Sequence, residues 1–203
     1  VGGTGLYFKA LTEGLVNIPK IPINFRNKVR NLHKSIGQKK FFQKLLQIDP
    51  LIKDRINSLD VQRSLRAYEI KSFTKKSMIS WFKNTKSDYS HNDFFKICID
   101  FPRKDLIERI NKRSENMIKL GAILEVKKFI KLRVPKNKSL SKAIGISEIK
   151  QYLQKKIQTE QLIEKISIKT RQYAKRQSTW ARGHMKDWNK VNPAGLDKLL
   201  KKI

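Results

Sequence analysis

The sequence is poor in cysteine, histidine, acidic residues and long apolar runs, and each shortage excludes a class of protein. A single cysteine, Cys98, cannot form a disulfide within the chain, which fits a reducing compartment and predicts a cytoplasmic location. The three histidines lie far apart in the sequence, so no spacing typical of a zinc site is present. No run of about 18 apolar residues exists, which excludes a transmembrane helix, and we expect no membrane partner.

The first residues, Val1-Gly2-Gly3-Thr4-Gly5, carry no initiator methionine. They also lack the basic and apolar regions of a signal peptide. We therefore expect the chain to begin within a longer protein.

Recognisable catalytic signatures are also missing. No Gly-Lys-Ser/Thr follows a glycine-rich segment at the spacing of a Walker A motif. Nothing has the local signature of a Ser/His/Asp or Cys/His constellation. Paired carboxylates such as Glu160 and Glu164 have the spacing of helix-surface charges. We therefore predict no metal site and no complete phosphate loop made by this chain.

Positive charge is what the sequence has in excess. Lys and Arg number 46 against 17 Asp and Glu, which gives a formal net charge of +29. Such an excess favours a polyanionic partner, with nucleic acid first and an anionic membrane surface second. Abundant Lys, Ile and Asn, as AT-biased genomes encode, would raise the charge without any partner.

Apolar spacing predicts a mostly helical chain. Several short helices are expected between residues 22 and 84, one of them ending at Gly37 and another capped by Asp60. Phe94–Ile99 is the best strand candidate, because it is short, aromatic and β-branched. Longer helices follow, predicted at residues 103–119, 122–132, 145–154 and 158–183.

Two short segments offer groups suited to phosphate. Gly2-Gly3-Thr4-Gly5 would let a substrate approach the backbone closely, and Thr4 would present a hydroxyl at a helix start. A plain turn is the alternative. Gln62, Arg63 and Arg66 place an amide and two forked guanidiniums on one helix edge, where a solvated basic face is the alternative.

The segment Thr170–Arg182 is the most informative. One predicted stripe should face the body of the protein, and a second, basic stripe should face a polyanion. The first comprises Ile166, Thr170, Tyr173, Gln177 and Trp180, and the second Arg171, Lys175, Arg182 and Lys186. Because a buried amide needs partners, Gln177 is predicted to contact a ligand. An ordinary amphipathic basic helix is the alternative.

Three segments in order resemble the tRNA dimethylallyltransferase (tRNA isopentenyltransferase) family. Gly2–Tyr7 is similar to its GGTxLY motif, Gln62–Glu69 to its QRxxRAxE motif, and Thr170–Trp180 to its TRQxAKRQxTW motif. The resemblance covers about residues 1 to 185. It implies transfer of the dimethylallyl group of dimethylallyl diphosphate to N6 of adenine-37 of tRNA, with release of pyrophosphate and with Mg²⁺ as cofactor. The adenine would be flipped out of the anticodon loop to react.

The resemblance also implies a fold and a domain order. The fold would be a P-loop-NTPase-like α/β core with an inserted helical domain that grips the anticodon stem-loop. Residues 1–19 would belong to the core, 20–92 to the insertion, and 93–203 to the core again, with one strand followed by helices. The protein is expected to be a monomer.

Site residues carry over from the motifs. Thr4 would line the meeting point of adenine and isoprenoid, and Lys127 would lie near the diphosphate. Lys142–Ser147 resembles an RxxGYR motif but departs from it at the first Arg, the Tyr and the last Arg. The residues expected to contact tRNA are Arg26, Gln62, Arg63, Arg66, Lys142, Gly145, Arg171, Gln172, Lys175, Arg176, Gln177, Trp180 and Arg182.

The family's phosphate loop and its general-base Asp precede the GGTxLY motif, and neither is in this sequence. Because a leaving diphosphate needs stabilisation, we predict that these 203 residues alone do not catalyse the transfer. The competing hypothesis is a non-enzymatic, basic helical RNA-binding protein. It explains the charge and the helices but not the three ordered motifs. A membrane-surface protein fits less well, because the stripe around Gln177 is too polar.

Overall fold

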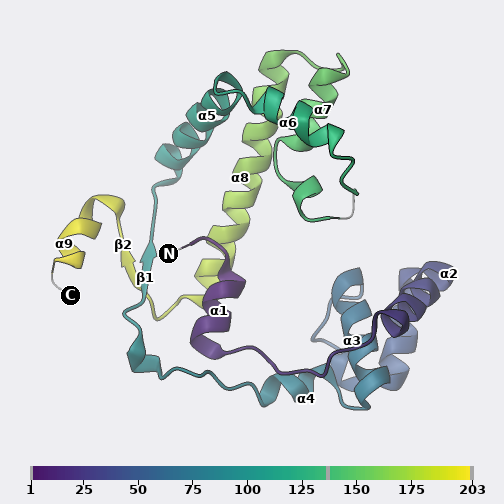
Figure 1. Cartoon of the computed structure of the whole chain (residues 1–203). Helices are drawn as coiled ribbons and strands as arrows, with labels where there is room; N and C mark the ends of the chain where they lie inside the picture. The colour runs from purple at the N-terminus through teal and green to yellow at the C-terminus, as the bar shows by residue number, and fades with distance from the viewer. Residues whose placement is uncertain (1, 136–137, 202–203) are drawn as a thin grey trace. The chain divides into compact units, whose positions relative to one another are not determined.

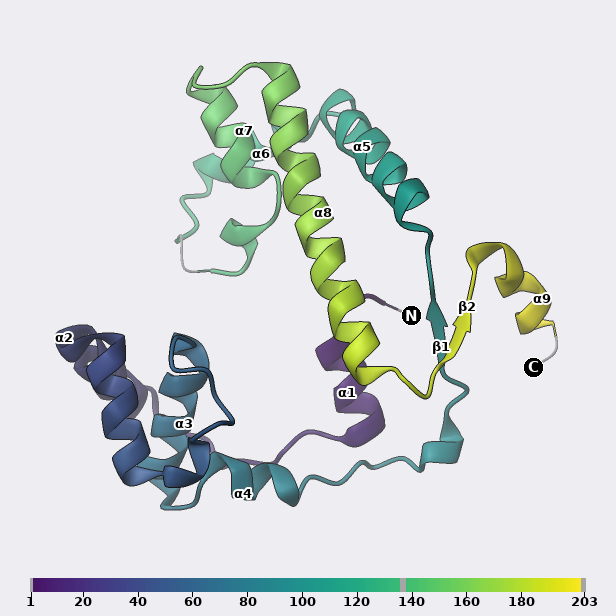
Figure 2. The ribbon, with the colours of Figure 1, turned by 180° about the vertical axis from the view of Figure 1, so that it is seen from behind.

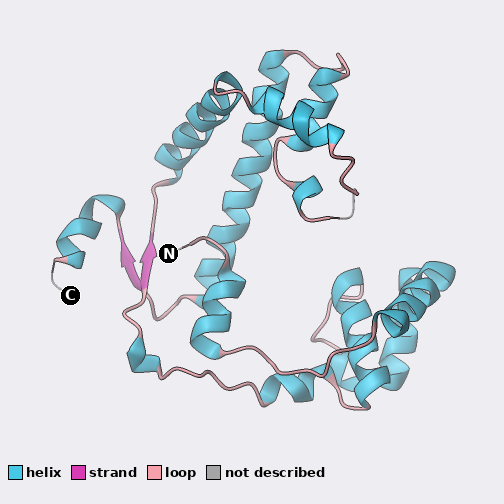
Figure 3. Ribbon diagram, in the orientation of Figure 1, coloured by secondary structure: helices cyan, strands magenta, loops and turns pink. Residues whose placement is uncertain are grey.

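The computed structural model describes residues 2–135 and 138–201, which are mostly helical (Figure 3). This confirms the predicted helical character of the chain. The chain divides into two compact units. One unit is Leu6–Phe94, and the other combines the N-terminal residues up to Gly5 with the chain from Phe95 onward. The functional division predicted at residues 20 and 92 stays a prediction.

The unit Leu6–Phe94 is built around a helix pair, α2 and α3. Its elements are α1 (Gly5–Glu13, whose first residue belongs to the other unit), α2 (Ile23–Ile48), η1 (Pro50–Ile52), α3 (Val61–Thr74), α4 (Met78–Lys83) and η2 (His91–Asp93). Phe25 meets Phe73 edge-on with ring centroids 5.5 Å apart, and Phe41 packs on Tyr68 at 4.9 Å. Both aromatic pairs join α2 to α3. Aliphatic side chains from the helices and their connections fill the core between them.

Two local predictions in this unit are confirmed. Gly37 has φ 74° and ψ 166°, which breaks the helical geometry and makes a kink inside α2. Asp60 caps α3, since its side chain accepts a hydrogen bond from the Arg63 amide at 3.0 Å.

The second unit is dominated by the long helix α8, against which α5 and α7 pack (Figure 1). Its elements are β1 (Ile97–Ile99), α5 (Arg103–Lys119), α6 (Ala122–Lys131), η3 (Leu140–Lys142), α7 (Ile146–Leu153), α8 (Thr159–His184), β2 (Asn189–Val191), η4 (Pro193–Gly195) and α9 (Leu196–Leu200). Each of the four predicted helices matches an observed helix to within one residue at either end. The core comprises Val126, Ile146, Ile149, Leu162 and Ile166.

A two-stranded parallel sheet lies in this unit. Strand β1 pairs with β2 in the register Ile97 to Asn189 and Ile99 to Val191, and the strands lie side by side in both views (Figures 1 and 2). The predicted strand is confirmed, although it is shorter than Phe94–Ile99. The prediction of one strand followed only by helices was wrong, because Asn189–Val191 is too short and polar to carry a strand pattern and forms only by pairing with β1.

No helix among the described residues is both long and apolar enough to cross a membrane.

Candidate nucleic-acid interface

The first and third sequence motifs meet on the C-terminal half of α8. The amide nitrogen of Gln177 donates a hydrogen bond to the Gly3 carbonyl oxygen at 2.9 Å, although the two residues are 174 positions apart. The Gly2–Gly5 turn is thereby anchored to α8. Thr4 lies in this turn, directly ahead of α1, and is exposed.

Close approach explains two of the three glycines in this turn. A Cβ atom at Gly3 would lie 2.5 Å from Nε2 of Gln177, and one at Gly5 would lie 2.2 Å from the indole of Trp180. A Cβ at Gly2 would meet nothing within 4 Å. Gly3 and Gly5 are therefore needed because α8 side chains occupy the space that a side chain would take.

Trp180 packs against two other residues of its unit. The imidazole of His184 stacks on its indole with ring centroids 4.4 Å apart and planes 2° from parallel, and His184 Nδ1 hydrogen-bonds to the Trp180 carbonyl oxygen at 3.0 Å. Gly5 also lies against the indole, since a Cβ atom at Gly5 would be 2.2 Å from its ring atoms. The indole therefore packs against both Gly5 and His184, and its contact with tRNA stays a prediction.

Gln177 was predicted to contact a ligand because a buried amide needs hydrogen-bond partners, and the structure gives it a partner within the protein. Its amide nitrogen donates to the Gly3 backbone, so a protein partner takes the place of the ligand that was expected for this donor. Contact of Gln177 with tRNA stays a prediction.

The two stripes predicted on α8 are only partly as expected. Ile166 is buried, but Tyr173 is 43% exposed and does not face the body. The buried residues of α8 are Leu162, Ile166 and Ser167, all in its first part. The prediction that Tyr173 faces the body was wrong.

The basic stripe is divided in a similar way. Arg171 is half-buried and donates to Oδ1 of Asn111 on α5 at 3.0 Å. Lys186 follows the end of α8 at His184. Four residues expected to contact tRNA are exposed on the C-terminal half of the helix, namely Gln172, Lys175, Arg176 and Arg182. These exposed groups are the ones that a polyanion could reach.

The second motif lies on α3 and has two parts. Gln62 and Arg63 are exposed, and Arg63 pairs with Asp60 at 3.5 Å. Arg66 instead points toward Glu69, whose Oε2 lies 3.5 Å from Arg66 Nη1 and 3.2 Å from Arg26 Nε. Glu69, which the sequence reasoning did not single out, is 2% exposed. Its signal was an acidic residue three positions after Arg66 in a basic segment.

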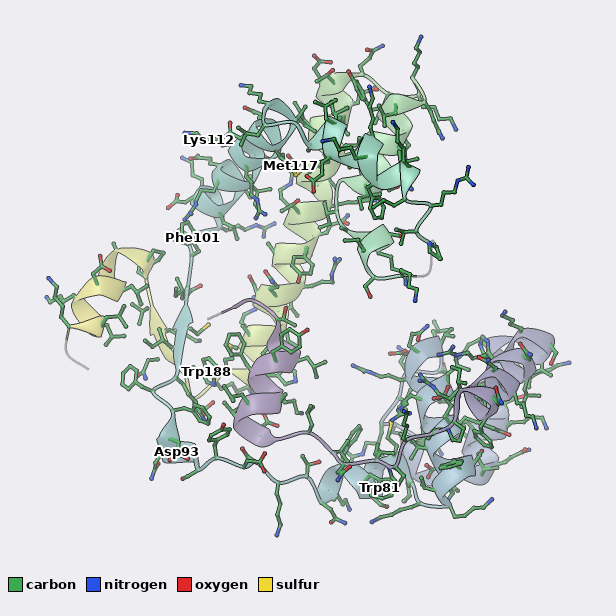
Figure 4. All side chains as sticks on the ribbon, viewed as in Figure 1. Trp81, Asp93, Phe101, Lys112, Met117 and Trp188 are labelled. Atoms are coloured by element: carbon green, nitrogen blue, oxygen red, sulfur yellow. The ribbon has the colours of Figure 1, made fainter. Side chains whose placement is uncertain are left out.

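A groove of about 530 Å³ runs between α5 and α6, and sequence reasoning missed it as well. Figure 4 shows Phe101 just ahead of α5, and Lys112 and Met117 along the helix. The guanidinium of Arg109 lies over the Phe101 ring, 4.8 Å from its centroid. The groove is lined by Arg109, Lys112, Arg113, Asn116, Met117, Leu120, Ala122 and Glu125. Three cations against one carboxylate make it attractive to an anion.

The predicted diphosphate residue, Lys127, is exposed on α6 and is not part of the lining of this groove. A helical signal for the groove did exist, since Arg109 and Arg113 are four positions apart on one helix.

The Lys142–Gly145 segment leads into α7. Lys142 is exposed, whereas Gly145 is buried and has φ 104°, a conformation that favours glycine. The Gly145 amide donates to Oε2 of Glu148 at 3.0 Å, and the other carboxylate oxygen of Glu148 pairs with Lys169. The position of Gly145 is thus explained by the start of α7, and its contact with tRNA stays a prediction.

The part of the chain that the structure describes contains no cluster of metal-ligating side chains for Mg²⁺. No three His, Cys, Asp or Glu side chains converge there. The described residues therefore offer no cluster of three metal ligands, and Mg²⁺ as cofactor stays a prediction.

Comparison with known proteins gives a consistent picture. The sequence model of the family described as IPP transferase matches residues 1–184. A tRNA dimethylallyltransferase of Pelagibacter ubique is 56% identical over 203 residues, which are the whole of this chain and 65% of that protein. A tRNA dimethylallyltransferase of Rickettsia massiliae is 40% identical over 188 residues, or 92% of this chain and 52% of that protein.

Solved structures agree. A eukaryotic dimethylallyltransferase acting on tRNA has a TM-score of 0.69 at 25% identity, covering 89% of this chain and 46% of that one. The tRNA isopentenylpyrophosphate transferase of Bacillus halodurans has a TM-score of 0.55 at 29% identity, covering 95% and 58%. The chain thus spans about half to two thirds of the proteins that it matches.

Proposed function

The chain belongs to the IPP transferase family, and we propose that it takes part in transfer of a dimethylallyl group to tRNA. The group would pass from dimethylallyl diphosphate to N6 of adenine-37, beside the anticodon, giving N6-dimethylallyladenosine and pyrophosphate. The names of the relatives support prenyl transfer to tRNA, and the position of the adenine follows from the motif resemblance.

The observation that carries this proposal is the anchoring of the Gly2–Gly5 turn on α8. The hydrogen bond from Gln177 and the packing of Trp180 on Gly5 fix the backbone on both sides of Thr4. The exocyclic amine of adenine is a weak nucleophile, so the reaction depends on precise positioning of the two substrates. A turn held at two points, with an exposed hydroxyl between them, suits that task.

The tRNA would be held by the exposed cations. Lys175, Arg176 and Arg182 can each contact a phosphate from the last turns of α8. Gln62 and Arg63 offer a second exposed set on α3. The net charge of +29 supports attraction of a long polyanion over a large surface.

The diphosphate has two candidate sites. Lys127 is the site that the resemblance implies, and the groove with Arg109, Lys112 and Arg113 is the site that the charge distribution favours. Cations near the leaving group stabilise the negative charge that develops there. Mg²⁺, which the resemblance implies, would bind oxygen atoms of the diphosphate and neutralise part of their charge.

The proposed α/β core is supported by the parallel pairing of β1 and β2. Parallel strands occur almost only in sheets with helices on their faces, and a two-stranded parallel pair is too small to be stable alone. The pair suits the edge of a larger sheet.

A chimaera tests the proposed function. The 203 residues replace the corresponding segment of the Pelagibacter ubique relative, to which they are 56% identical. Transfer of labelled dimethylallyl from its diphosphate to tRNA is then measured, with mass spectrometry of the nucleosides to locate the product. We expect N6-dimethylallyladenosine at position 37. The isolated 203-residue chain, as the control, should bind tRNA without transferring the group.

A folded chimaera that binds tRNA and yields no prenylated adenosine would favour the non-enzymatic RNA-binding alternative. Prenyl transfer by the isolated chain would overturn the prediction that these 203 residues do not catalyse the reaction without a phosphate loop.

A further inference from the structure

Glu69 is a buried carboxylate shared by two guanidiniums within the unit Leu6–Phe94. It lies on α3, and its Oε2 accepts a hydrogen bond from Nε of Arg26 on α2 at 3.2 Å. The same oxygen forms an ion pair with Nη1 of Arg66, on its own helix, at 3.5 Å. The carboxylate side chain is 3% exposed, while the two guanidinium side chains are 38% and 41% exposed. The negative charge is therefore hidden, and the positive charges remain accessible.

Both guanidiniums line one pocket. It has a volume of about 650 Å³ and is bounded by residues 18–23 together with Arg26 and Arg66. Lys20 adds a third cation, and no carboxylate is among the lining residues. The pocket is therefore an anion site by charge.

Glu69 binds one more guanidinium than its own charge requires. A buried carboxylate requires a cationic partner, and one guanidinium supplies it. The second guanidinium leaves the triad with one net positive charge. Two guanidiniums repel each other, so the carboxylate between them is what holds them close. Each guanidinium has five N–H donors, and the contacts with Glu69 leave most of them for a ligand.

We propose that Glu69 is a positioning residue that holds Arg26 and Arg66 as a paired clamp for one phosphate group. This rests on the proposed function, which supplies a phosphate of the tRNA backbone as the ligand. Forked guanidiniums match the oxygen atoms of a phosphate, and a fixed pair places its donors before the ligand arrives. Free pyrophosphate has the same chemistry, and the test separates the two sources.

The test asks whether Glu69→Gln binds RNA more tightly or more weakly than the unchanged protein. Glu69→Gln removes one negative charge and keeps a side chain of the same size with an oxygen acceptor. Charge alone predicts tighter binding of RNA, because the protein becomes more positive. Loss of positioning predicts weaker binding, by about tenfold, the effect of one charge-assisted hydrogen bond. Binding of an anticodon stem-loop RNA is measured over a series of salt concentrations.

Asp60→Asn is the matched control. Asp60 is also a carboxylate paired with an arginine near the same helix, at 3.5 Å from Arg63, but it is more exposed. Asn keeps the cap of α3, since it is an equally good N-cap residue. We expect Asp60→Asn to bind RNA as the unchanged protein does or slightly more tightly.

The outcomes separate the hypotheses. Weaker RNA binding by Glu69→Gln, with Asp60→Asn unaffected, supports the clamp on an RNA phosphate. Weaker binding of inorganic pyrophosphate alone, measured by calorimetry, also supports the clamp and identifies a free diphosphate as its ligand. Unchanged or tighter binding of both ligands by Glu69→Gln would overturn the clamp.

Two controls remove the remaining ambiguity. Circular dichroism checks that Glu69→Gln folds. If it does not fold, Arg66→Lys keeps the charge but loses the fork, and RNA binding as strong as that of the unchanged protein would then refute the clamp. If the unchanged chain itself fails to bind the stem-loop, the proposed function fails, which is a result distinct from failure of the clamp.

Discussion

The contact between Gly5 and Trp180 leads to a stability prediction with a definite sign. In Gly5→Ala, the new Cβ atom would lie 2.2 Å from the indole. Carbon atoms in contact are normally about 3.5–4.0 Å apart, so the backbone or the ring must move by more than about 1 Å. The ring has little room to move, because His184 stacks on it with centroids 4.4 Å apart.

Two opposing effects set the magnitude. Replacing Gly by Ala at an unhindered helical position stabilises a protein by about 0.4–1 kcal/mol, through lower entropy of the unfolded chain. Forcing extra atoms into a packed site costs about 1–3 kcal/mol. We therefore expect Gly5→Ala to lower the free energy of unfolding by roughly 1–2 kcal/mol, since the clash involves a ring on which His184 is already stacked.

The neighbouring glycines provide controls. At Gly2, a Cβ would meet nothing within 4 Å, so Gly2→Ala should leave stability unchanged. At Gly3, the nearest atom is the end of the flexible Gln177 side chain, 2.5 Å away. Gly3→Ala should therefore cost about one hydrogen bond, or roughly 0.5–1.5 kcal/mol.

Urea unfolding followed by tryptophan fluorescence measures these differences. A Trp81→Phe background leaves Trp180 and Trp188, both in the unit that contains Gly5, so the signal reports on that unit. Combining Gly5→Ala with Trp180→Ala should remove most of the penalty in a double-mutant cycle. If Gly5→Ala is as stable as Gly2→Ala, the packing of the first motif on the third is refuted.

The remaining predictions concern binding. Changing Lys175, Arg176 and Arg182 together to Gln should lower the magnitude of the salt slope of tRNA binding by about 2–3, the effect of three lost phosphate contacts, with an unchanged circular dichroism spectrum. A slope that does not move would mean that these cations form only a solvated face. Changing Arg109 and Arg113 to Gln should weaken pyrophosphate binding measured by calorimetry, whereas Lys127→Gln should not. The reverse pattern would place the diphosphate at Lys127.

Short-range features of this protein were predictable because their causes are short-range. The helix of residues 103–119 follows from apolar spacing after Pro102, and α6 and α7 begin beside Gly121 and Gly145, both with positive φ. The cap at Asp60 depends on an amide three residues away. Family membership was equally accessible, since three ordered motifs are read from the sequence directly.

Long-range features escaped sequence reasoning for the converse reason. The role of Glu69 depends on Arg26, 43 positions away on another helix. Strand β2 exists only because Ile97–Ile99 supplies a partner for three residues with little strand character of their own. The exposure of Tyr173 depends on which part of α8 other segments cover, and the periodicity of α8 does not specify that.

The sequence by itself determined which segments are helical, that the chain is strongly basic, and which family it resembles, because spacing, charge and motif order are properties of the chain alone. The tertiary structure decided what the motif residues do. Gln177 donates a hydrogen bond to the Gly3 carbonyl, Trp180 packs against Gly5 and His184, and Arg66 shares a buried carboxylate with Arg26. Burial and pairing depend on neighbours that folding brings from distant parts of the chain, so no local pattern could have specified them.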